Sequence, residues 1–335
     1  MRRFVDAGPW AIAVDCDLPS IHDGLAANFG GRYRTQARAG ARLLTCEVVN
    51  NPEKYGAAVD GAVLNGPHIK VSEGVTIQYG LHPPKTWLSV TNTAMIELDA
   101  RTPEVCRVLL HPDVASSQTR AERPAACAEA FFYPALVEWI RSFDACLVHC
   151  GAVGIGGRAV FLSGPPGSGK STHVLRMLLR GVAFVADDLA FLVPQPTGLR
   201  LMPLREVANV NASTIETFPE LASLKSSPLR DDQKYCVSIP ECFPRTPIID
   251  VAPGVVLRLH PGAEPTLEPV PRDRVLDGLH AMAWFGSRPD ANQRHFWLLN
   301  DWLIESTQWS VSQGYMKNHL DELLERLGND LGRSM

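Results

Sequence analysis

The stretch Gly164-Pro165-Pro166-Gly167-Ser168-Gly169-Lys170-Ser171 decides the expected fold, because it fits the pattern G-x-x-x-x-G-K-[ST] at every position. The glycines of such a loop let consecutive backbone N–H groups turn inward around phosphate oxygens, and the N-terminus of the following helix adds a partial positive charge. The flanking sequence has the required order, since Arg158–Ser163 predicts a strand and Lys170–Arg180 a helix that ends at Gly181. The stretch therefore predicts a phosphate loop of the Walker A type.

The polar side chains at the end of this loop have separate expected tasks. Lys170 supplies a mobile positive charge to β- and γ-phosphate oxygens, and the Ser171 hydroxyl is placed to ligate Mg²⁺. ATP and Mg²⁺ are therefore the expected cofactors. The predicted nucleotide-binding residues are Gly164, Pro165, Pro166, Gly167, Ser168, Gly169, Lys170, Ser171 and Thr172.

A pair of acids, Asp187 and Asp188, follows the apolar run Val182–Ala186. A short apolar run is typical of a strand buried on both faces, and a carboxylate that ends such a strand beside a phosphate loop usually holds Mg²⁺. Only 17 residues separate Lys170 from Asp187, so the acids are expected at the end of the very next strand. Two adjacent acids suggest two tasks, one at the metal and one at an acceptor proton. In the simpler interpretation they only begin a turn.

His149 lies in Leu147–Ile155, a predicted strand that the turn Gly156-Gly157 joins to the strand Arg158–Ser163. A lone histidine in an apolar strand is more often a hydrogen-bonded core residue than a catalytic group. Here the predicted hairpin can bring the histidine near the γ-phosphate, because it pairs with the strand that leads into the phosphate loop. His149 is therefore a candidate catalytic residue together with Lys170.

Taken together, these three features resemble the HPr kinase/phosphorylase family. In that family a histidine and a glycine on a strand, a hairpin, a phosphate loop and a Val-Ala-Asp-Asp stretch follow one another. The matching stretches here are Val148-His149-Cys150-Gly151, Gly164–Ser171 and Val185-Ala186-Asp187-Asp188, all within Leu147–Val193. The resemblance implies an α/β fold with a mixed-sheet P-loop kinase core of the HPr kinase and phosphoenolpyruvate carboxykinase type.

The resemblance also implies ATP-dependent phosphorylation of a hydroxyl, with Asp187 as proton acceptor, Asp188 and Ser171 on Mg²⁺, and His149 near the transferred phosphoryl group. The chain departs from the family where a Glu-x-Arg-Gly-x-Gly stretch is replaced by Pro203–Asn209. It therefore resembles divergent members that modify acceptors other than HPr, including serines of peptide precursors.

The expected activity is that of an ATP-dependent phosphotransferase whose acceptor is a serine of a peptide or protein, or a small-molecule alcohol. Three alternatives stay open: a nucleotide-dependent ATPase or switch without an acceptor, a scaffold that only binds nucleotide, and a phosphoserine phosphorylase or phosphatase. The stretch Asp232-Gln233-Lys234-Tyr235 resembles a lysine-containing segment of the divergent relatives that could offer a second phosphate contact. An exposed loop lysine is the simpler interpretation.

The chain as a whole is expected to form two domains, with a boundary after residue 119. Residues 1–119 predict a mostly β domain that supports the rest or recognises the acceptor, and residues 120–335 the catalytic domain with C-terminal helices. Pro134 interrupts a helical pattern at Arg120–Asp144, which predicts a kink or two helices. Further expected elements are strands at Ala11–Val14, Arg42–Val49, Val75–Tyr79, Trp87–Thr91 and Gly254–Leu259, and helices at Ile21–Phe29, capped by Ser20, and at Met316–Leu327.

Composition excludes several classes of protein. The 335 residues are 45% hydrophobic and 20% charged, which excludes a disordered or fibrous chain. A net charge of −4 does not favour general binding to nucleic acid, and no apolar run has the length of about 18 residues that a membrane span needs. The N-terminus does not resemble a signal peptide, and none of the 8 cysteines forms a C-x-x-C pair. A reduced, cytoplasmic protein is expected, and a homo-oligomer stays open.

Overall fold

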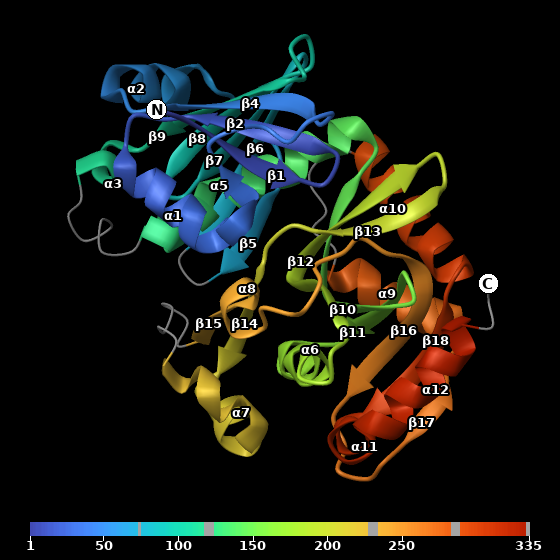
Figure 1. Cartoon of the computed structure of the whole chain (residues 1–335). Helices are drawn as coiled ribbons and strands as arrows, with labels where there is room; N and C mark the ends of the chain where they lie inside the picture. Colours follow the sequence, from blue (N-terminus) through green and yellow to red (C-terminus); the bar gives the residue numbers. More distant parts are fainter. Residues whose placement is uncertain (73–74, 117–123, 227–233, 283–288, 333–335) are drawn as a thin grey trace. The chain divides into compact units, whose positions relative to one another are not determined.

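The computed structural model describes residues 1–72, 75–116, 124–226, 234–282 and 289–332. These residues form two compact units (Figure 1). The first unit comprises Met1–Phe143 and Phe285–Asn292, and the second comprises Asp144–Trp284 and Gln293–Met335. The predicted domain boundary after residue 119 lies within residues 117–123, outside the described part of the chain, and stays a prediction.

The first unit is built on a nine-stranded sheet of order β3-β1-β2-β4-β9-β8-β7-β6-β5. Strand β4 runs parallel to both β2 and β9, and the other neighbouring strands are antiparallel. The strands are β1 (Arg2–Ala7), β2 (Trp10–Asp15), β3 (Tyr33–Arg34), β4 (Arg42–Val49), β5 (His68–Ser72), β6 (Val75–His82), β7 (Lys85–Val90), β8 (Ala94–Asp99) and β9 (Val105–Leu110). The helices are α1 (Pro19–Phe29), η1 (Gly30–Arg32), α2 (Pro52–Gly61), α3 (Pro112–Ser116), α5 (Pro124–Ile140) and η2 (Arg141–Phe143).

The four strands predicted in this unit are confirmed as β2, β4, β6 and β7, with ends that differ by a few residues. The predicted cap at Ser20 is wrong. Helix α1 begins at Pro19, its N-cap is Leu18, and no side chain caps it. A proline suits the first turn of a helix, because its missing N–H would have no partner there.

Helix α5 is continuous through Pro134, so the interpretation as two helices is wrong. Every side chain from Phe131 to Ile140 is buried. The packing of so many apolar side chains offsets the one backbone hydrogen bond that a proline removes from a helix interior. A buried helix also explains why this segment of α5 is apolar apart from Glu138.

The two faces of the nine-stranded sheet carry different helices. Tyr79 pairs with Leu88 in register and therefore faces the side of the sheet opposite to Trp87. On the Tyr79 side, its hydroxyl donates to the Glu138 carboxylate of α5 over 3.2 Å. On the Trp87 side, Trp87 packs against a cluster that includes Ala58 of α2. Helices α5 and α2 thus cover opposite faces.

The second unit is built on a seven-stranded sheet of order β13-β12-β10-β11-β16-β18-β17 and a small β14-β15 sheet. The strands are β10 (Cys146–Ile155), β11 (Arg158–Ser163), β12 (Ala183–Gln195), β13 (Gly198–Pro203), β14 (Val207–Asn211), β15 (Lys234–Ser238), β16 (Ala252–His260), β17 (Leu267–Pro269) and β18 (Thr307–Ser312). The helices are α6 (Lys170–Leu178), α7 (Ala212–Thr217), η3 (Pro219–Ser226), α8 (Ile239–Cys242), α9 (Arg272–Met282), α10 (Pro289–Ile304), α11 (Gln313–Asn318) and α12 (Leu320–Gly332).

Parallel pairs join β11 to β16 and β16 to β18, and the other pairs of the seven-stranded sheet are antiparallel. Since both large sheets are mixed, the predicted α/β class with mixed sheets is confirmed. The single helix expected at Met316–Leu327 is wrong, because α11 ends before His319 and α12 begins at Leu320.

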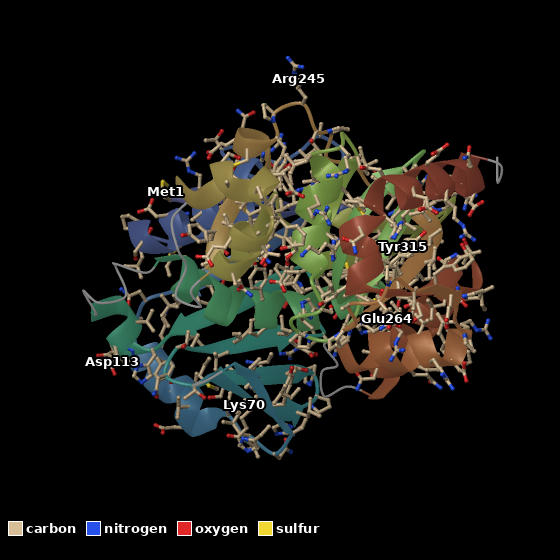
Figure 2. All side chains as sticks on the ribbon, turned by 90° about the horizontal axis from the view of Figure 1, so that it is seen from below. Met1, Lys70, Asp113, Arg245, Glu264 and Tyr315 are labelled. Carbon is tan, nitrogen blue, oxygen red and sulfur yellow. The ribbon has the colours of Figure 1, made fainter. Side chains whose placement is uncertain are left out.

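The exposed side chain of Arg245, which follows α8, points away from the ribbon (Figure 2). Within the described residues, no helix combines the length and the apolar character needed to cross a membrane.

The predicted hairpin of β10 and β11 is confirmed, with Gly151 opposite Leu162 and Ile155 opposite Arg158. Strand β12 pairs with the other edge of β10. It does not end at the acid pair as predicted, because the apolar residues Leu189–Val193 continue the strand alongside β13. The acids therefore lie in the middle of a long strand next to β10.

Candidate functional site

The loop Gly164–Ser171 connects β11 to α6 and curls through three glycines with positive φ. Gly164 has a φ of 148°, Gly167 of 79° and Gly169 of 91°. Residues with a side chain rarely adopt such conformations. A Cβ at Gly164 would also lie 2.7 Å from the Ser168 hydroxyl. The backbone path of this loop therefore requires glycine.

Lys170 folds back over the loop that precedes it. Its ammonium nitrogen donates to the carbonyl oxygen of Gly164 over 2.8 Å and to that of Pro165 over 3.3 Å. The residue is only 8% exposed. Gln313, at the start of α11, donates from its side-chain amide to the carbonyl oxygen of Gly167 over 3.2 Å. No motif in the sequence predicts this contact of Gln313.

Gly151 allows α6 to approach β10 closely. A Cβ at this position would lie 2.9 Å from a methyl group of Val174 and 3.4 Å from the Cβ of Lys170. Gly151 also pairs directly with Asp187 of β12. The absence of a side chain in β10 thus brings the first turn of α6 and the acid pair together.

Asp187 is almost completely buried, at 2% exposure. Its Oδ2 atom accepts the backbone N–H of Asn209 over 2.8 Å, and Oδ1 makes no hydrogen bond of ordinary geometry within the described residues. Burial, followed by the neighbouring charge of Asp188, raises the pKa of Asp187 to about 6. The N–H of Asn209, the nearby Ser171 hydroxyl and the charge of Arg205 act in the opposite direction on this pKa.

Asp188 lies between two basic side chains. Its Oδ1 atom is 3.0 Å from Nε2 of His149, and its Oδ2 atom is 2.6 Å from a guanidinium nitrogen of Arg205. The side chain of Asp188 is 42% exposed and that of Arg205 only 1%. Asp188 is therefore held by partners on one side and remains open to solvent.

A positive φ turns Asp188 to the same side of the sheet as Asp187. Asp187 pairs with Gly151 and Asp188 with Cys150, so regular alternation would direct the two acids to opposite faces. Asp188 nevertheless contacts His149, which shares the face of Gly151. Its φ of 75° departs from strand geometry and accounts for this turn. Both carboxylates thus face the side of the sheet on which α6 packs.

Arg205 and Asn209 contact the acid pair, and neither contact is predicted from the sequence. Both lie in Pro203–Asn209, the segment that departs from the family pattern. The segment carries two charged residues, Arg205 and Glu206, between apolar neighbours, and a charged residue is seldom buried unless it is paired.

The structure brings together Lys170, Ser171, Asp187, Asp188 and His149 around the first turn of α6 and the middle of β10 and β12. Two further predicted residues have other contacts. The hydroxyl of Thr172 is 3.2 Å from that of Thr214 in α7. Lys234 pairs through its backbone with Asn211 in the small sheet, and residues 232 and 233 lie outside the described part of the chain.

The donor set around Asp187 fits Mg²⁺. Within the described residues, no group of three or more His, Cys, Asp or Glu side chains gathers as a metal cage. Mg²⁺ is usually held by one or two carboxylates, water and substrate phosphates rather than by such a cage. The buried Oδ1 atom of Asp187 and the neighbouring Ser171 hydroxyl are oxygen donors of the required kind.

We expect the substitution Asp187→Asn to stabilise the metal-free protein above pH 6. Because the folded-state pKa of Asp187 is raised from 3.8 to about 6, the wild-type protein loses stability as the pH rises from about 4 through 6. An amide still accepts the N–H of Asn209 but carries no charge. The difference in unfolding free energy should grow with pH and reach up to about 3 kcal/mol at pH 8. Thermal unfolding between pH 4.5 and 8 with a chelator measures it, and parallel pH profiles would contradict the expectation.

Comparisons with known proteins find structural likenesses, and no likeness in sequence. No family model matches the sequence, and no curated protein matches it. The solved structure of the Hpr(Ser) kinase/phosphatase from Coxiella burnetii is similar to 54% of this chain and 92% of that chain, with 12% sequence identity and a TM-score of 0.27.

Proposed function

We propose that the chain is an ATP- and Mg²⁺-dependent phosphotransferase that moves the γ-phosphoryl group of ATP to a hydroxyl. The observation that carries the proposal is the position of the Gly164–Ser171 loop beside two carboxylates that face the same helix. A curled glycine-rich backbone at a helix N-terminus is suited to phosphate oxygens. Carboxylates beside it are suited to a metal and to an acceptor proton. We infer a P-loop kinase core of the HPr kinase and phosphoenolpyruvate carboxykinase type on the same residues.

Phosphoryl transfer needs positioned charge more than it needs covalent chemistry. The backbone of the loop and the ammonium group of Lys170 would bind the phosphates, after Lys170 leaves the carbonyl groups that it contacts here. The Ser171 hydroxyl and a carboxylate would hold Mg²⁺. When bound, the metal would neutralise charge on the phosphate oxygens during transfer.

The two acids would divide the remaining tasks. The family resemblance assigns Asp187 to the proton and Asp188 to the metal. The contacts favour the reverse assignment, because Asp187 is buried beside the Ser171 hydroxyl and Asp188 is open to solvent beside His149. A general base must come within hydrogen-bond distance of the acceptor hydroxyl, and a half-exposed carboxylate meets that requirement more readily. Their separate responses to Mg²⁺ distinguish the assignments.

His149 and Arg205 would act as positioning residues for Asp188. Each of them contacts a different oxygen of the carboxylate, at 3.0 Å and 2.6 Å. Two fixed partners on separate oxygens restrict the rotation of a carboxylate. The carboxylate is then held in one orientation for accepting a proton. The buried position of Arg205 makes its side chain the more rigid of the two.

The test is incubation of the full chain with γ-labelled ATP and Mg²⁺ together with a pooled library of serine-containing peptides and a panel of small alcohols. Label should appear on an acceptor, and Lys170→Ala should abolish the transfer. Arg245→Ala, which removes an exposed side chain, is the matched control and should transfer label at the wild-type rate. Rapid hydrolysis of ATP with no labelled acceptor would instead support an ATPase or switch.

A further inference from the structure

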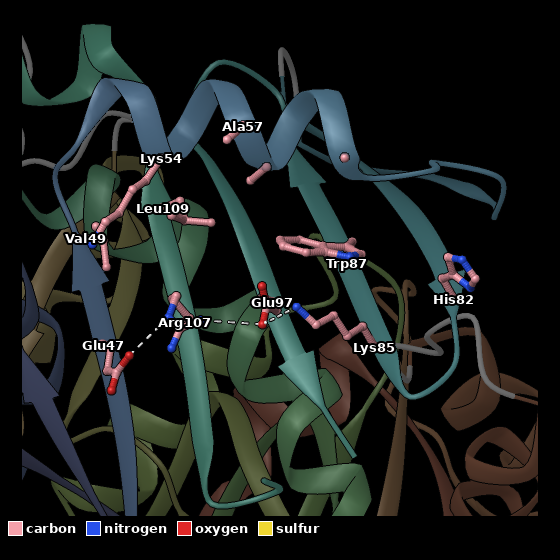
Figure 3. A pocket seen from close by; sticks show the side chains of 12 residues that line it. Glu47, Val49, Lys54, Ala57, His82, Lys85, Trp87, Glu97, Arg107 and Leu109 are labelled. Carbon is pink, nitrogen blue, oxygen red and sulfur yellow. Dashed lines mark hydrogen bonds and ion pairs between the residues drawn. The ribbon is translucent and has the colours of Figure 1, made fainter. Parts of the chain in front are cut away.

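A pocket of about 740 Å³ lies between α2 and the face of the nine-stranded sheet that α2 covers (Figure 3). Pockets that bind small ligands or peptide side chains usually have volumes of about 300–1,000 Å³. All twelve lining residues belong to the first unit and come from α2 and the strands β4, β6, β7, β8 and β9. None of them belongs to the proposed active site.

One wall of the pocket is a row of side chains from four neighbouring strands. Glu47 of β4 pairs with Arg107 of β9, Arg107 with Glu97 of β8, and Glu97 with Trp87 of β7. Residues that are paired across strands direct their side chains to the same face. The register of the sheet therefore builds an ordered row of charged and aromatic groups.

Ion pairs hold the charged members of this wall in place. Nε of Arg107 is 3.1 Å from the Glu47 carboxylate, and Nη1 of Arg107 is 3.6 Å from the Glu97 carboxylate. The ammonium group of Lys85 is 3.0 Å from Glu97 and 5.4 Å from the centre of the Trp87 ring. The three ion pairs, drawn as dashed lines in Figure 3, keep the cationic groups at the pocket rather than extended into solvent.

The pocket carries one cation more than it carries carboxylates. Lys54 of α2 joins Lys85 and Arg107, against the two carboxylates Glu47 and Glu97. Lys54 has no ion-pair partner within the described residues. Figure 3 shows Lys54 and Arg107 on the side of the pocket where Leu109 lies. Because Arg107 also pairs with Glu47 over 3.1 Å, an anion at this side would meet Lys54 directly and would share Arg107 with that carboxylate.

Apart from Lys54, the wall formed by α2 is made of small residues without polar side chains. Ala57, Ala58 and Gly61 line the pocket from the helix, and Trp87 and Leu109 line it from the sheet. Small side chains leave room between the helix and the indole ring. An apolar group in that space would remove the Trp87 face and the helix surface from water, which is favourable by about 25 cal/mol per Å².

We propose that this pocket binds a ligand in which an apolar group is joined to a carboxylate. The apolar group lies between α2 and Trp87, and the carboxylate lies at Lys54 and Arg107. Both a free amphipathic carboxylate and a peptide segment with adjacent apolar and acidic side chains have this chemistry. The inference goes beyond the proposed phosphotransferase activity and does not depend on it.

The experiment is calorimetric titration of the full chain with four probes: N-acetyl-L-phenylalanine, its carboxamide, acetate, and the capped peptide acetyl-Gly-Phe-Glu-Gly-amide. The carboxylate probes that carry the phenyl group should bind one per chain, and the carboxamide and acetate should bind at least about tenfold more weakly. Higher salt should weaken the binding, because the carboxylate meets exposed cations. A tighter complex with the peptide identifies a peptide segment as the source, and a tighter complex with the free acid identifies a small carboxylate.

Three variants tie this binding to the pocket. Lys54→Ala should weaken the binding at least about threefold, and Ala57→Phe should abolish it by filling the space beside Trp87. Lys70→Ala is the matched control, since Lys70 is an exposed cation that does not line the pocket, and it should bind normally. Equal affinity for the acid and the carboxamide, unchanged binding in Ala57→Phe, or no binding of any probe would overturn the proposal. Lys170→Ala should bind the probes normally, which separates this result from the proposed activity.

Discussion

Asp187→Asn and Asp188→Asn should respond differently to added Mg²⁺ in a phosphoryl-transfer assay. The variant that lacks the proton acceptor should lose about 10²–10⁴-fold in turnover with little change in ATP affinity, because the chemical step loses its base while the phosphates keep their contacts. Extra metal should not restore it. The variant that lacks the metal ligand should bind Mg²⁺ more weakly and recover part of its rate at high Mg²⁺.

The structure predicts which of the two variants added Mg²⁺ should rescue. If the buried carboxylate beside the Ser171 hydroxyl is the Mg²⁺ ligand, added Mg²⁺ should rescue Asp187→Asn. The assignment implied by the family resemblance predicts rescue of Asp188→Asn instead. The measurement is a titration of rate against Mg²⁺ for each variant, with ATP affinity determined at every metal concentration. Arg245→Ala serves as the control for handling and metal contamination. Identical rescue curves would show that both acids share one metal role, and the assignment of a base to this pair would be abandoned.

Lys170→Ala should weaken the binding of ATP by about 10–100-fold, since a hydrogen bond to a charged group contributes about 1.5–3 kcal/mol. The binding of AMP should be weakened much less, because the ammonium group of Lys170 is expected at the β- and γ-phosphates. In the structure this group contacts two carbonyl oxygens of the loop. The alanine variant therefore also loses contacts within the loop, and a fold control is needed.

Calorimetric titration of ATP and AMP into the wild-type and variant proteins measures this effect. Thermal unfolding of both proteins in the absence of nucleotide shows whether the fold is retained, and Arg245→Ala should match the wild type in both assays. The nucleotide assignment of the loop would fail if a folded Lys170→Ala bound ATP with wild-type affinity. A loss of the same size for ATP and AMP would place the lysine away from the β- and γ-phosphates.

Local patterns were sufficient for the central hairpin and the helix that follows the loop. The apolar run of β10, the turn at Gly156-Gly157 and the strand β11 were predicted because strand alternation and turn chemistry act over a few residues. The same local rules failed where neighbours far along the chain decide the outcome. Strand β12 continues past Asp187 because β13 pairs with its second half. The residues of the acid pair do not predict this pairing with β13.

The sequence by itself determined the loop Gly164–Ser171, its lysine and serine, and the acids that follow at fixed spacing. Only the tertiary structure decided how those acids are used. Arg205 reaches Asp188 from 17 residues away, and Asn209 reaches Asp187 from 22 residues away, through a connection whose path depends on the order of the strands. The positive φ of Asp188 likewise depends on the contacts around it, since an aspartate adopts that conformation only where its surroundings favour it. Residue chemistry and spacing are local properties of the chain, whereas the pairing of side chains across a sheet is settled when distant strands meet.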